Sequence, residues 1–293
     1  MRSVDGILLL HKPEGITSFE VLQFVKRHFY TPKVGHTGTL DRFASGLLLV
    51  VVGSYTKLAD LLQDLEKEYE GVIEFGRETD TLDPEGVPVA EGPVPPLEEI
   101  VTQIPSFMGI IPQSPPAYSA VHVGGERAYR MARKGVVVDP PPRLVEIRSI
   151  LIENYRPPLL TIRVVCSKGT YIRSLARDLG RKCGSAAYLK DLVRLRIGPF
   201  RLQDAVLPSD LGEKTTLQQG SEILSLLFPG RVLPVVPSFG VEKGKPLRPS
   251  LWKNVQFQEG PYILVSPEGM LMGAVQYQGG RLSYRFVVSR KNL

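Results

Sequence analysis

The spacing of apolar residues predicts one amphipathic helix and one deeply buried strand near the N-terminus. Residues 17–29 place apolar side chains on one helical face, and Thr17 and Glu20 have the spacing of a capping box. A continuous run of Leu and Val follows at residues 46–53, bracketed by glycines. Because a run without polar alternation is typical of a strand covered on both sides, we expect that strand to be buried on both faces.

Two further strands and a second helix are predicted in the middle of the chain. Residues 68–75 alternate, with Tyr69 on the apolar side and mostly Glu on the other, which indicates a half-buried strand. Residues 159–166 alternate in the same way. They lead to residues 172–183, where apolar side chains share one helical face, and Gly184 is suited to end that helix.

Proline and glycine divide the chain. Residues 83–96 are rich in both and residues 111–116 in proline, which predicts loops with short ordered pieces. A proline-broken connector occupies residues 232–239, and short β-like runs separated by glycine turns follow it. This pattern predicts two domains, a larger one over residues 1–231 and a small β domain over residues 240–293.

The composition is that of an ordinary globular protein, since 43% of the 293 residues are apolar and 23% are charged. The longest uninterrupted apolar run, residues 47–52, is far shorter than the roughly 20 residues that span a bilayer. The two cysteines are too few for a disulfide scaffold, and the four histidines lack metal-ligand spacing. We therefore expect a cytoplasmic protein without a membrane segment or a metal.

The formal charge of +6 is unevenly distributed along the chain. Residues 60–100 contain thirteen acidic and two basic side chains, whereas residues 122–201 contain seventeen basic and six acidic ones. A basic segment of this length suggests a polyanion such as nucleic acid as the partner. It is equally consistent with cations that pair with the acidic segment, and charge alone does not decide between the two.

The densest group of candidate residues lies at residues 33–53. Three glycines there, Gly35, Gly38 and Gly46, let the backbone turn tightly around Asp41. The phosphate-loop pattern GxxxxGK[ST] is absent, and the segment precedes a strand, unlike a dinucleotide-binding motif, which follows one. A lone Asp in such a loop is more often a turn or capping residue than a catalyst, so local chemistry makes Asp41 only a candidate.

A second group lies where the later alternating strand meets the following helix. Lys168 and the first amides of that helix are suited to a phosphate. Arg173 falls in the first helical turn, where a cation opposes the helix dipole, and this indicates a specific anionic partner such as Asp41. Arg177 and Arg181 are better explained as an exposed face of the helix.

Five blocks of the sequence carry a resemblance to a known family. In order, they are HKPEGITS (11–18), GHTGTLDRFASGLL (35–48), KEYEGVIEFGRETDT (67–81), PPAYSAVHVGGERAYRMARKG (115–135) and SKGTYIRSLARDLG (167–180). Together they resemble the TruB family, bacterial tRNA pseudouridine synthases that isomerise uridine 55 in the T-loop. The resemblance covers about the first two hundred residues, and the C-terminal part resembles a short PUA-type domain. One departure is Arg42, where the family usually has proline after the aspartate.

The resemblance implies a fold and a chemistry. The fold is α+β, with a mixed, mainly antiparallel sheet flanked by helices and loops. Asp41 is then the catalytic carboxylate, acting either as a nucleophile on C1′ or as a base that removes the C2′ proton. Arg173 pairs with Asp41, favours its ionised form and fixes its orientation. Tyr69 stacks on the target base and takes part in proton transfer at C5. The isomerisation that the resemblance implies requires no cofactor, metal or redox step.

The resemblance also implies how RNA is bound. The target uridine flips out of its loop, and His36 fills the gap that it leaves. The basic segment 124–143 closes over the T-loop and contacts phosphates, which positions the RNA without reading its sequence. The implied partner is tRNA, and the implied oligomeric state is a monomer. The implied RNA-binding residues are His36, Lys12, Tyr171, Lys168, Arg127, Arg130 and Arg133.

Two other functions are consistent with parts of the sequence. A noncatalytic RNA-binding protein would keep the basic surface, although the intact Asp41, Tyr69 and Arg173 argue against it. A hydrolase would use Asp41 and Asp80 as an acid and base pair. The hydrolase predicts two carboxylates across a cleft, whereas the isomerase predicts one carboxylate beside an arginine.

Overall fold

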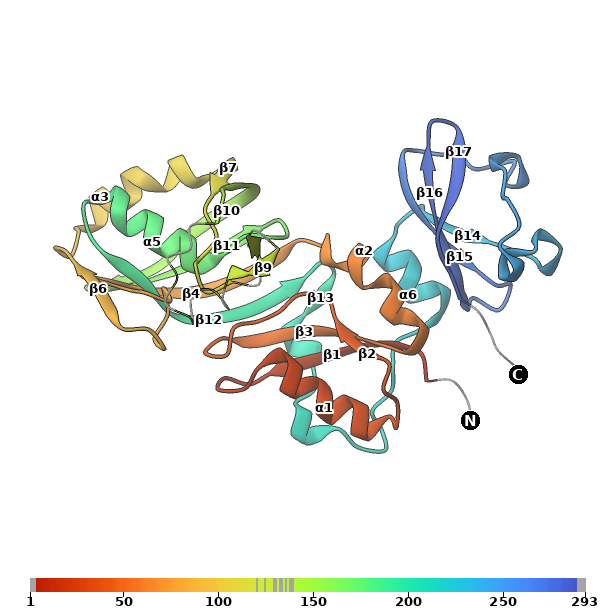
Figure 1. The fold of residues 1–293 in the computed structure, drawn as a ribbon, viewed down its shortest axis with the longest axis horizontal. Helices are drawn as coiled ribbons and strands as arrows, with labels where there is room; N and C mark the ends of the chain where they lie inside the picture. The colour runs from red at the N-terminus through yellow and green to blue at the C-terminus, as the bar shows by residue number, and fades with distance from the viewer. Residues whose placement is uncertain are drawn as a thin grey trace.

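A computed structural model describes residues 4–119, 121–123, 125–128, 131, 134, 136 and 140–288. Its main element is a nine-stranded sheet in the order β1-β3-β12-β4-β11-β10-β7, with β2 paired to β3 and β13 to β12 (Figure 1). The strands of this sheet are β1 (Gly6–Lys12), β2 (Val34–His36), β3 (Ser45–Val52), β4 (Lys67–Phe75), β7 (Gly109–Gln113), β10 (Arg143–Arg156), β11 (Leu159–Cys166), β12 (Ala187–Ile197) and β13 (Phe200–Arg201). Within the described residues, β3 and β12 form its parallel pair and the other pairs are antiparallel, so the expected mixed, mainly antiparallel α+β fold is confirmed.

The helix predicted over residues 17–29 is α1 (Ser18–His28). The Thr17 hydroxyl accepts a hydrogen bond from Glu20 N (3.2 Å), and Thr17 N donates to the Glu20 carboxylate (2.7 Å), which completes the capping box. Val21 and Val25 of α1 pack against alternate residues of β1 and β3. The helix therefore covers one face of these two strands.

The other face of β1 and β3 is covered as well, which explains the continuous apolar run. The side chains on that face pack against α2 (Ala59–Gln63) and α6 (Gly220–Leu227). Both helices lie between the large sheet and the C-terminal strands (Figure 1). Every residue from Gly46 to Val52 is buried. The prediction of a strand buried on both faces is confirmed.

The alternating segments predicted in the middle of the chain are β4 and β11, which pair with each other. The apolar side of β4 and the alternate residues of β11 pack beneath α5 (Ile172–Lys182), with α3 (Leu97–Gln103) beside them. Gly184 has φ 59°, the left-handed conformation that ends a helix. Both predicted strands and the predicted helix are confirmed, whereas β10 and β12 were not predicted.

The acidic and basic segments meet because β4 lies between β11 and β12. Arg196 of β12 bonds to Glu66 (2.6 Å) and Glu68 (2.8 Å), and Arg163 of β11 lies within ion-pair distance of Glu68 (3.7 Å) and Glu70 (3.5 Å). A large part of the charge asymmetry is therefore internal pairing, as one of the two interpretations expected. The uneven charge along the sequence therefore gives less support for a nucleic-acid partner than the sequence alone indicates.

A four-stranded sheet forms near the C-terminus, in the order β14-β15-β16-β17. Part of the proline-broken connector forms β14 (Val232–Pro234), which pairs in parallel with β15 (Gly260–Val265). The predicted β-like runs are β15, β16 (Leu271–Gln278) and β17 (Arg281–Val287). One face of this sheet packs against α6, and the other covers a cluster around Trp252.

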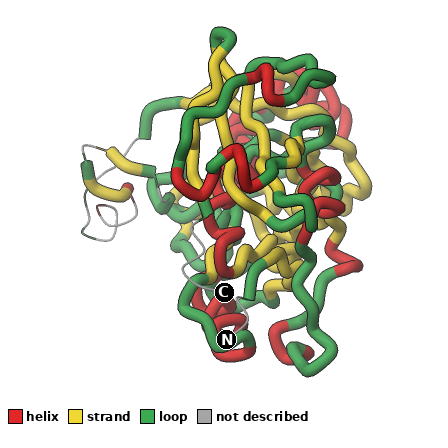
Figure 2. Tube along the Cα trace, turned by 90° about the vertical axis from the view of Figure 1, so that its right-hand side faces the viewer, coloured by secondary structure: helices red, strands yellow, loops and turns green. Residues whose placement is uncertain are grey.

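Two small hairpins complete the described structure. β5 (Arg77–Thr79) pairs with β6 (Pro88–Glu91), and β8 (His122–Val123) pairs with β9 (Glu126–Arg127). The β8–β9 hairpin projects from the body of the molecule (Figure 2). Of the predicted RNA-binding residues in segment 124–143, Arg130 and Arg133 lie outside the described residues, and only the backbone of Arg127 is described. No helix in the described ranges is long and apolar enough to cross a membrane.

Candidate active site

A cavity of about 650 Å³ lies where the loop between β2 and β3 meets β4, β12 and the start of α5. It is lined by residues 17–19, 36–42, 118–119 and 167–173, together with Gln63, Lys67, Tyr69, Leu192 and Arg194. Its charged lining residues are one carboxylate, Asp41, and the cations Arg42, Lys67, Lys168, Arg173 and Arg194. This excess of cations in a concave site favours an anionic ligand.

Asp41 stands in the loop between β2 and β3, and that loop is tied down on two sides. Leu40 is buried, its N–H donates to Ser18 Oγ (3.0 Å), and Ser18 Oγ lies 3.2 Å from Leu40 O. At Gly46 (φ 114°), a Cβ would lie only 2.5 Å from backbone atoms of Arg194. The loop is therefore fixed to α1 and β12, while the Asp41 side chain stays 37% exposed.

Arg173 lies in the first turn of α5 and is only 4% exposed. Its Nη2 donates to Asp41 Oδ1 (3.0 Å), and its Nε lies 2.9 Å from Asp41 Oδ2 without the alignment of a hydrogen bond. The carbonyls of Thr81 and Tyr118 accept bonds from Nη1 (2.8 Å) and Nη2 (3.2 Å). The predicted ion pair between Asp41 and Arg173 is confirmed, and its anion explains a cation in this helical turn.

Asp83 is a second carboxylate on Arg173 that sequence reasoning missed. Its Oδ2 lies 3.1 Å from Arg173 Nη1, and the residue is buried. It also accepts hydrogen bonds from the Thr81 hydroxyl (2.5 Å) and from Glu85 N (3.1 Å). Burial raises the pKa of Asp83, and the Thr81 bond and the Arg173 charge act in the opposite direction. Asp83 thus holds Arg173 from the protein side while Asp41 faces the cavity.

Asp80, the carboxylate that the hydrolase hypothesis pairs with Asp41, does not line the cavity. It accepts a hydrogen bond from Val87 N (2.9 Å) within the turn between β5 and β6, and lies 3.4 Å from the Tyr118 hydroxyl. Asp41 is the carboxylate among the lining residues, and it stands beside an arginine. This arrangement is the one that the isomerase hypothesis predicts.

Tyr69 and Arg194 are direct cross-strand partners on β4 and β12. Arg194 is 1% exposed, and no acidic side chain is among its described bonds: it donates to Leu47 O (2.7 Å) and Gly38 O (3.1 Å). Burial raises the pKa of Tyr69, and the Arg194 charge opposes that rise. Arg194 was missed, although its place two residues after Leu192 in an alternating strand puts it on the inward face.

His36 is at the end of β2, half-buried, and lines the cavity next to the Asp41 loop. Its Nδ1 accepts a hydrogen bond from Gly38 N (3.3 Å). Burial, and then the charge of Arg194, lower the pKa of His36, so that the ring is neutral at pH 7. A neutral, flat ring beside glycine-rich backbone is suited to stacking on a base.

Tyr171 and Lys168 approach the cavity from the strand-to-helix junction. Tyr171 precedes α5, and both its N–H (2.8 Å) and its carbonyl (3.1 Å) bond to the side-chain amide of Gln113 on β7. Burial raises the pKa of the Tyr171 hydroxyl. Lys168 is exposed at the rim and pairs with Asp64. Both residues are therefore at the site, Tyr171 in its wall and Lys168 at its edge.

Lys12 is fully buried and does not line the cavity. Its ammonium donates to the carbonyls of Pro13 (2.9 Å), Ile16 (2.7 Å) and Arg42 (3.3 Å). Burial lowers the pKa of Lys12 to about 8, and the charge of Asp41 opposes that change. In this arrangement Lys12 holds the backbone next to Asp41, and an RNA contact would require it to leave these carbonyls.

Arg42, which stands where the resemblance leads us to expect proline, ties the same backbone from the other side. Its Nε donates to Gly15 O (2.8 Å), and its own carbonyl accepts from Gly15 N (2.9 Å). Glu85 lies 4.0 Å from the same Nε. The loop is therefore braced by hydrogen bonds to the residue 13–16 turn where a proline ring would restrict it by geometry.

The exposed-face interpretation of the later α5 arginines is wrong for Arg177. That side chain is largely buried, and it bonds to Asp178 (2.7 Å) and to Ser114 O (3.0 Å). Arg181 is exposed, but it forms a two-bond ion pair with Glu78 (2.7 and 3.1 Å). The difference arises because residues 78 and 114 pack beside α5, which the helical pattern alone does not reveal.

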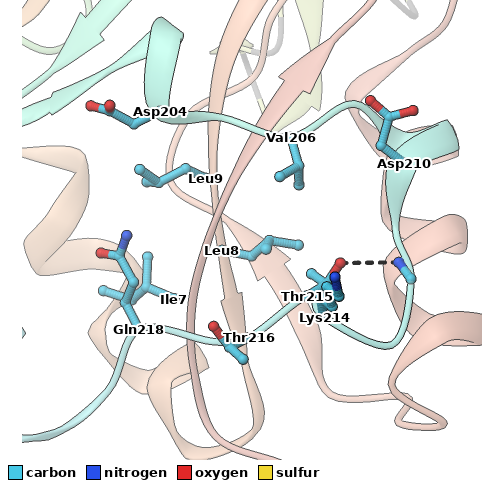
Figure 3. A pocket seen from close by; sticks show the side chains of 11 residues that line it. Ile7, Leu8, Leu9, Asp204, Val206, Asp210, Lys214, Thr215, Thr216 and Gln218 are labelled. Atoms are coloured by element: carbon cyan, nitrogen blue, oxygen red, sulfur yellow. Dashed lines mark hydrogen bonds between the residues drawn. The ribbon is translucent and has the colours of Figure 1, made fainter.

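A second cavity of about 330 Å³ lies against β1, between Ile7–Leu9 and residues 204–218 (Figure 3). The side chains of Asp204, Asp210 and Lys214 are part of its lining. None of the predicted site residues lines it. In the described ranges, no three His, Cys, Asp or Glu side chains are placed to hold a metal ion.

Known proteins are similar to this chain both in sequence and in fold. The model of the TruB family pseudouridylate synthase N-terminal domain matches residues 26–172. A tRNA pseudouridine synthase B of Borreliella burgdorferi (strain ZS7) is 44% identical over 216 residues, which cover 73% of this chain and 77% of the relative. The enzyme of that name from Dechloromonas aromatica (strain RCB) is 40% identical over 282 residues, 96% of this chain and 90% of the relative.

Solved structures with this architecture are more distant in sequence. The chain matched in a Cbf5-Nop10-Gar1 complex superposes with a TM-score of 0.70 at 22% identity, covering 96% of this chain and 84% of that one. The chain matched in an H/ACA RNP bound to a substrate RNA containing 2′-deoxyuridine gives 0.67 at 20% identity, covering 98% and 86%. At this level of identity the likeness concerns the fold.

Proposed function

The chain belongs to the TruB family of pseudouridylate synthases and is an isomerase that acts on tRNA, and from this premise we propose that it converts uridine 55 of the T-loop to pseudouridine with Asp41 as the catalytic carboxylate. The observation that carries the proposal is the ion pair between Asp41 and Arg173 in the wall of the larger cavity. Asp41 is the partly exposed member of that pair, so one of its oxygens can reach a substrate.

Asp41 is suited to the bond changes that the isomerisation needs. The reaction breaks the N1–C1′ bond, turns the uracil and joins C5 to C1′, with the C5 proton released and a proton taken up at N1. An ionised carboxylate serves either as the nucleophile on C1′ or as the base that takes the C2′ proton. Arg173 supports both routes, because its buried guanidinium holds the carboxylate in one orientation.

Tyr69 and His36 are proposed to handle the base. Tyr69 lines the cavity, which supports a role in which its ring stacks on the uracil and its hydroxyl takes part in proton transfer at C5. His36 would replace the flipped uridine in the stack of the T-loop, since flipping costs a few kcal/mol and leaves a gap. The neutral state of its ring lowers the cost of removing it from water.

The RNA backbone is proposed to lie across the cationic rim. Lys168 is exposed there, and Tyr171 forms the adjoining wall. Segment 124–143, with Arg127, Arg130 and Arg133, would add phosphate contacts over the T-loop. We further propose that the protein acts as a monomer in the cytoplasm, and that residues 240–293, together with β14, form a PUA-like domain that packs against α6 of the catalytic domain over residues 1–231.

The proposal is tested with unmodified tRNA. The wild-type protein and Asp41→Asn are incubated with the transcript, and pseudouridine is mapped at each position. We expect modification at position 55 by the wild type and none above background by the variant. Equal activity of the two proteins would remove Asp41 from the mechanism, modification elsewhere would reject the T-loop site, and binding without product would favour the noncatalytic RNA-binding protein.

A further inference from the structure

Exposed aromatic side chains on α1 and just beyond its end have no role in the proposed mechanism. Phe19 is 65% exposed, Phe24 39% and Tyr30, which follows the helix, 95%. The opposite face of α1 is buried against β1 and β3. Isolated exposed apolar residues are common, but two exposed aromatic rings on one short helix, with a third just beyond its end, suggest a surface that binds a partner.

The cations on this face lie directly over the rings. Lys26 Nζ is 5.6 Å from the centre of the Phe19 ring, and Arg27 Cζ is 5.0 Å from the centre of the Phe24 ring. Phe19 and Lys26 are seven residues apart in α1, so the helical period sets them on one side of the helix, about 10 Å apart along its axis, and Tyr30 lies just beyond the helix end. We call these five residues, Phe19, Phe24, Lys26, Arg27 and Tyr30, the α1 stripe.

Tyr30 has a backbone conformation that does not suit it. Its φ is 51°, in the left-handed region, at the position after the helix end where glycine is the usual residue. With 95% of the residue exposed, its ring gains little from packing that would offset the strain. A strained aromatic kept in solvent is typical of a residue retained for what its side chain binds.

The stripe is continuous with the catalytic cavity. Phe19 is both the first residue of the stripe and part of the cavity lining. A substrate whose reacting nucleotide occupies the cavity therefore passes the N-terminal end of the stripe. Since Lys26 and Arg27 outnumber the one acidic residue of α1, Glu20, the face also attracts an anion.

We propose that the α1 stripe is a second contact surface for the tRNA substrate, with unpaired bases stacked on Phe19 and Tyr30 and phosphates at Lys26 and Arg27. The inference rests on the proposed function, because it takes tRNA as the molecule in the cavity. Flat aromatic rings interleaved with cations fit single-stranded RNA, since every base offers a face for stacking and every nucleotide a phosphate. A protein partner would need acidic side chains opposite Lys26 and Arg27, whereas RNA carries a phosphate at every nucleotide.

Tyr30→Gly separates RNA binding from folding. Glycine relieves the left-handed strain, so the melting temperature should stay equal or rise, while loss of the ring should weaken tRNA binding about fivefold or more. Tyr30→Phe keeps the ring and should bind like the wild type. Leu226→Ala, which removes an exposed apolar side chain from α6, is the matched control and should leave the Kd unchanged. Binding is measured with full-length unmodified tRNA.

The cations are tested through salt. Replacing Lys26 and Arg27 together with Ala should lower the slope of log Kd against log salt by about 0.7 to 0.9 for each phosphate that the variant no longer neutralises. A wild-type protein that does not modify tRNA would reject the proposed function itself. If the wild type is active, then an unchanged Kd in Tyr30→Gly, an unchanged salt slope, or a loss of stability that matches the loss of affinity would overturn the second surface.

Discussion

Asp41 and Asp83 bind the same guanidinium, that of Arg173, from two sides. Asp41 Oδ1 accepts from Nη2 at 3.0 Å, and Asp83 Oδ2 lies 3.1 Å from Nη1. The two carboxylates differ in exposure, since Asp83 is buried and Asp41 opens to the cavity. This asymmetry lets the inner carboxylate hold the arginine while the outer one remains available to the substrate.

Replacing Asp83 with Asn should therefore damage both stability and rate. The buried guanidinium would lose an anionic partner, which costs about 3 kcal/mol of unfolding free energy for a broken buried pair. A shift of Arg173 and Asp41 by about 1 Å would lower the single-turnover rate on the order of a hundredfold. Chemical denaturation and single-turnover pseudouridine formation measure the two effects.

Asp80→Asn is the control for that prediction, because Asp80 is three residues away and bonds to Val87 N instead of Arg173. We expect it to keep the wild-type rate within a few-fold. If Asp80→Asn lost as much activity as Asp83→Asn, the effect would belong to the turn between β5 and β6 as a whole and not to the arginine.

Arg194 should prove to be a positioning residue for the two stacking groups. It bonds to Gly38 O, in the loop that follows His36, and it is the direct cross-strand partner of Tyr69. Arg194→Lys keeps the charge but loses the planar set of donors, so kcat should fall tenfold or more while KM changes less. A double-mutant cycle with Tyr69→Phe should be non-additive, because the two side chains act through one contact. Additive losses in that cycle would separate Arg194 from Tyr69.

The elements that were predicted from sequence are those whose signals are local. The capping box of Thr17 and Glu20 lies within four residues, and the alternation of β4 repeats without interruption. β10 was missed because register shifts between Ile147 and Ser149 and between Ile152 and Asn154 break its alternation. The regular pattern of β4 is readable from sequence, whereas two bulges in one strand hide the alternation of β10.

The site residues divide in the same way. Arg173 was found because a cation in the first turn of a helix is locally anomalous; this anomaly already suggested Asp41, 132 positions away, as its partner, and the resemblance implied the same pair. Asp83 has no such anomaly, since a turn of Asp and Thr looks like any polar turn. Its role depends on its burial and on its contact with Arg173, and both arise only from the tertiary structure. Lys12 was expected among RNA contacts, and its burial under three carbonyls is likewise invisible in its motif.

Arg42 should compensate for the absent proline through its bond to Gly15. Arg42→Ala removes the 2.8 Å bond from Nε to Gly15 O and should cost about 1 kcal/mol of stability and a few-fold in single-turnover rate. Arg42→Pro should retain more activity than Arg42→Ala, because the described backbone bonds at this position use its carbonyl and not its amide. A proline variant as slow as the alanine variant would show that the side-chain bond, and not loop rigidity, is what matters.

The single-turnover rate should fall as the pH rises through about 8, because Lys12 loses its proton there. The ammonium has three N–H groups for the carbonyls of Pro13, Ile16 and Arg42, whereas the neutral amine has two, so one carbonyl next to Asp41 loses its donor. Rates measured from pH 6.5 to 9.5 should show this limb in the wild type, and Lys12→Met should be slow with no limb.

The same proton has the opposite effect on stability, which separates loosening of the site from unfolding. The folded pKa of Lys12 lies below its ordinary value of 10.5, so its contribution to stability is fully present above pH 10.5 and is lost as the pH falls through about 8. If the single-turnover rate falls with rising pH while the free energy of unfolding does not fall, the loss of rate reports on the Asp41 loop and not on unfolding. Burial also lowers the pKa of Lys67 to about 8, so Lys67→Gln is the necessary control. The limb should persist in that variant, and its disappearance would assign the pH dependence to Lys67.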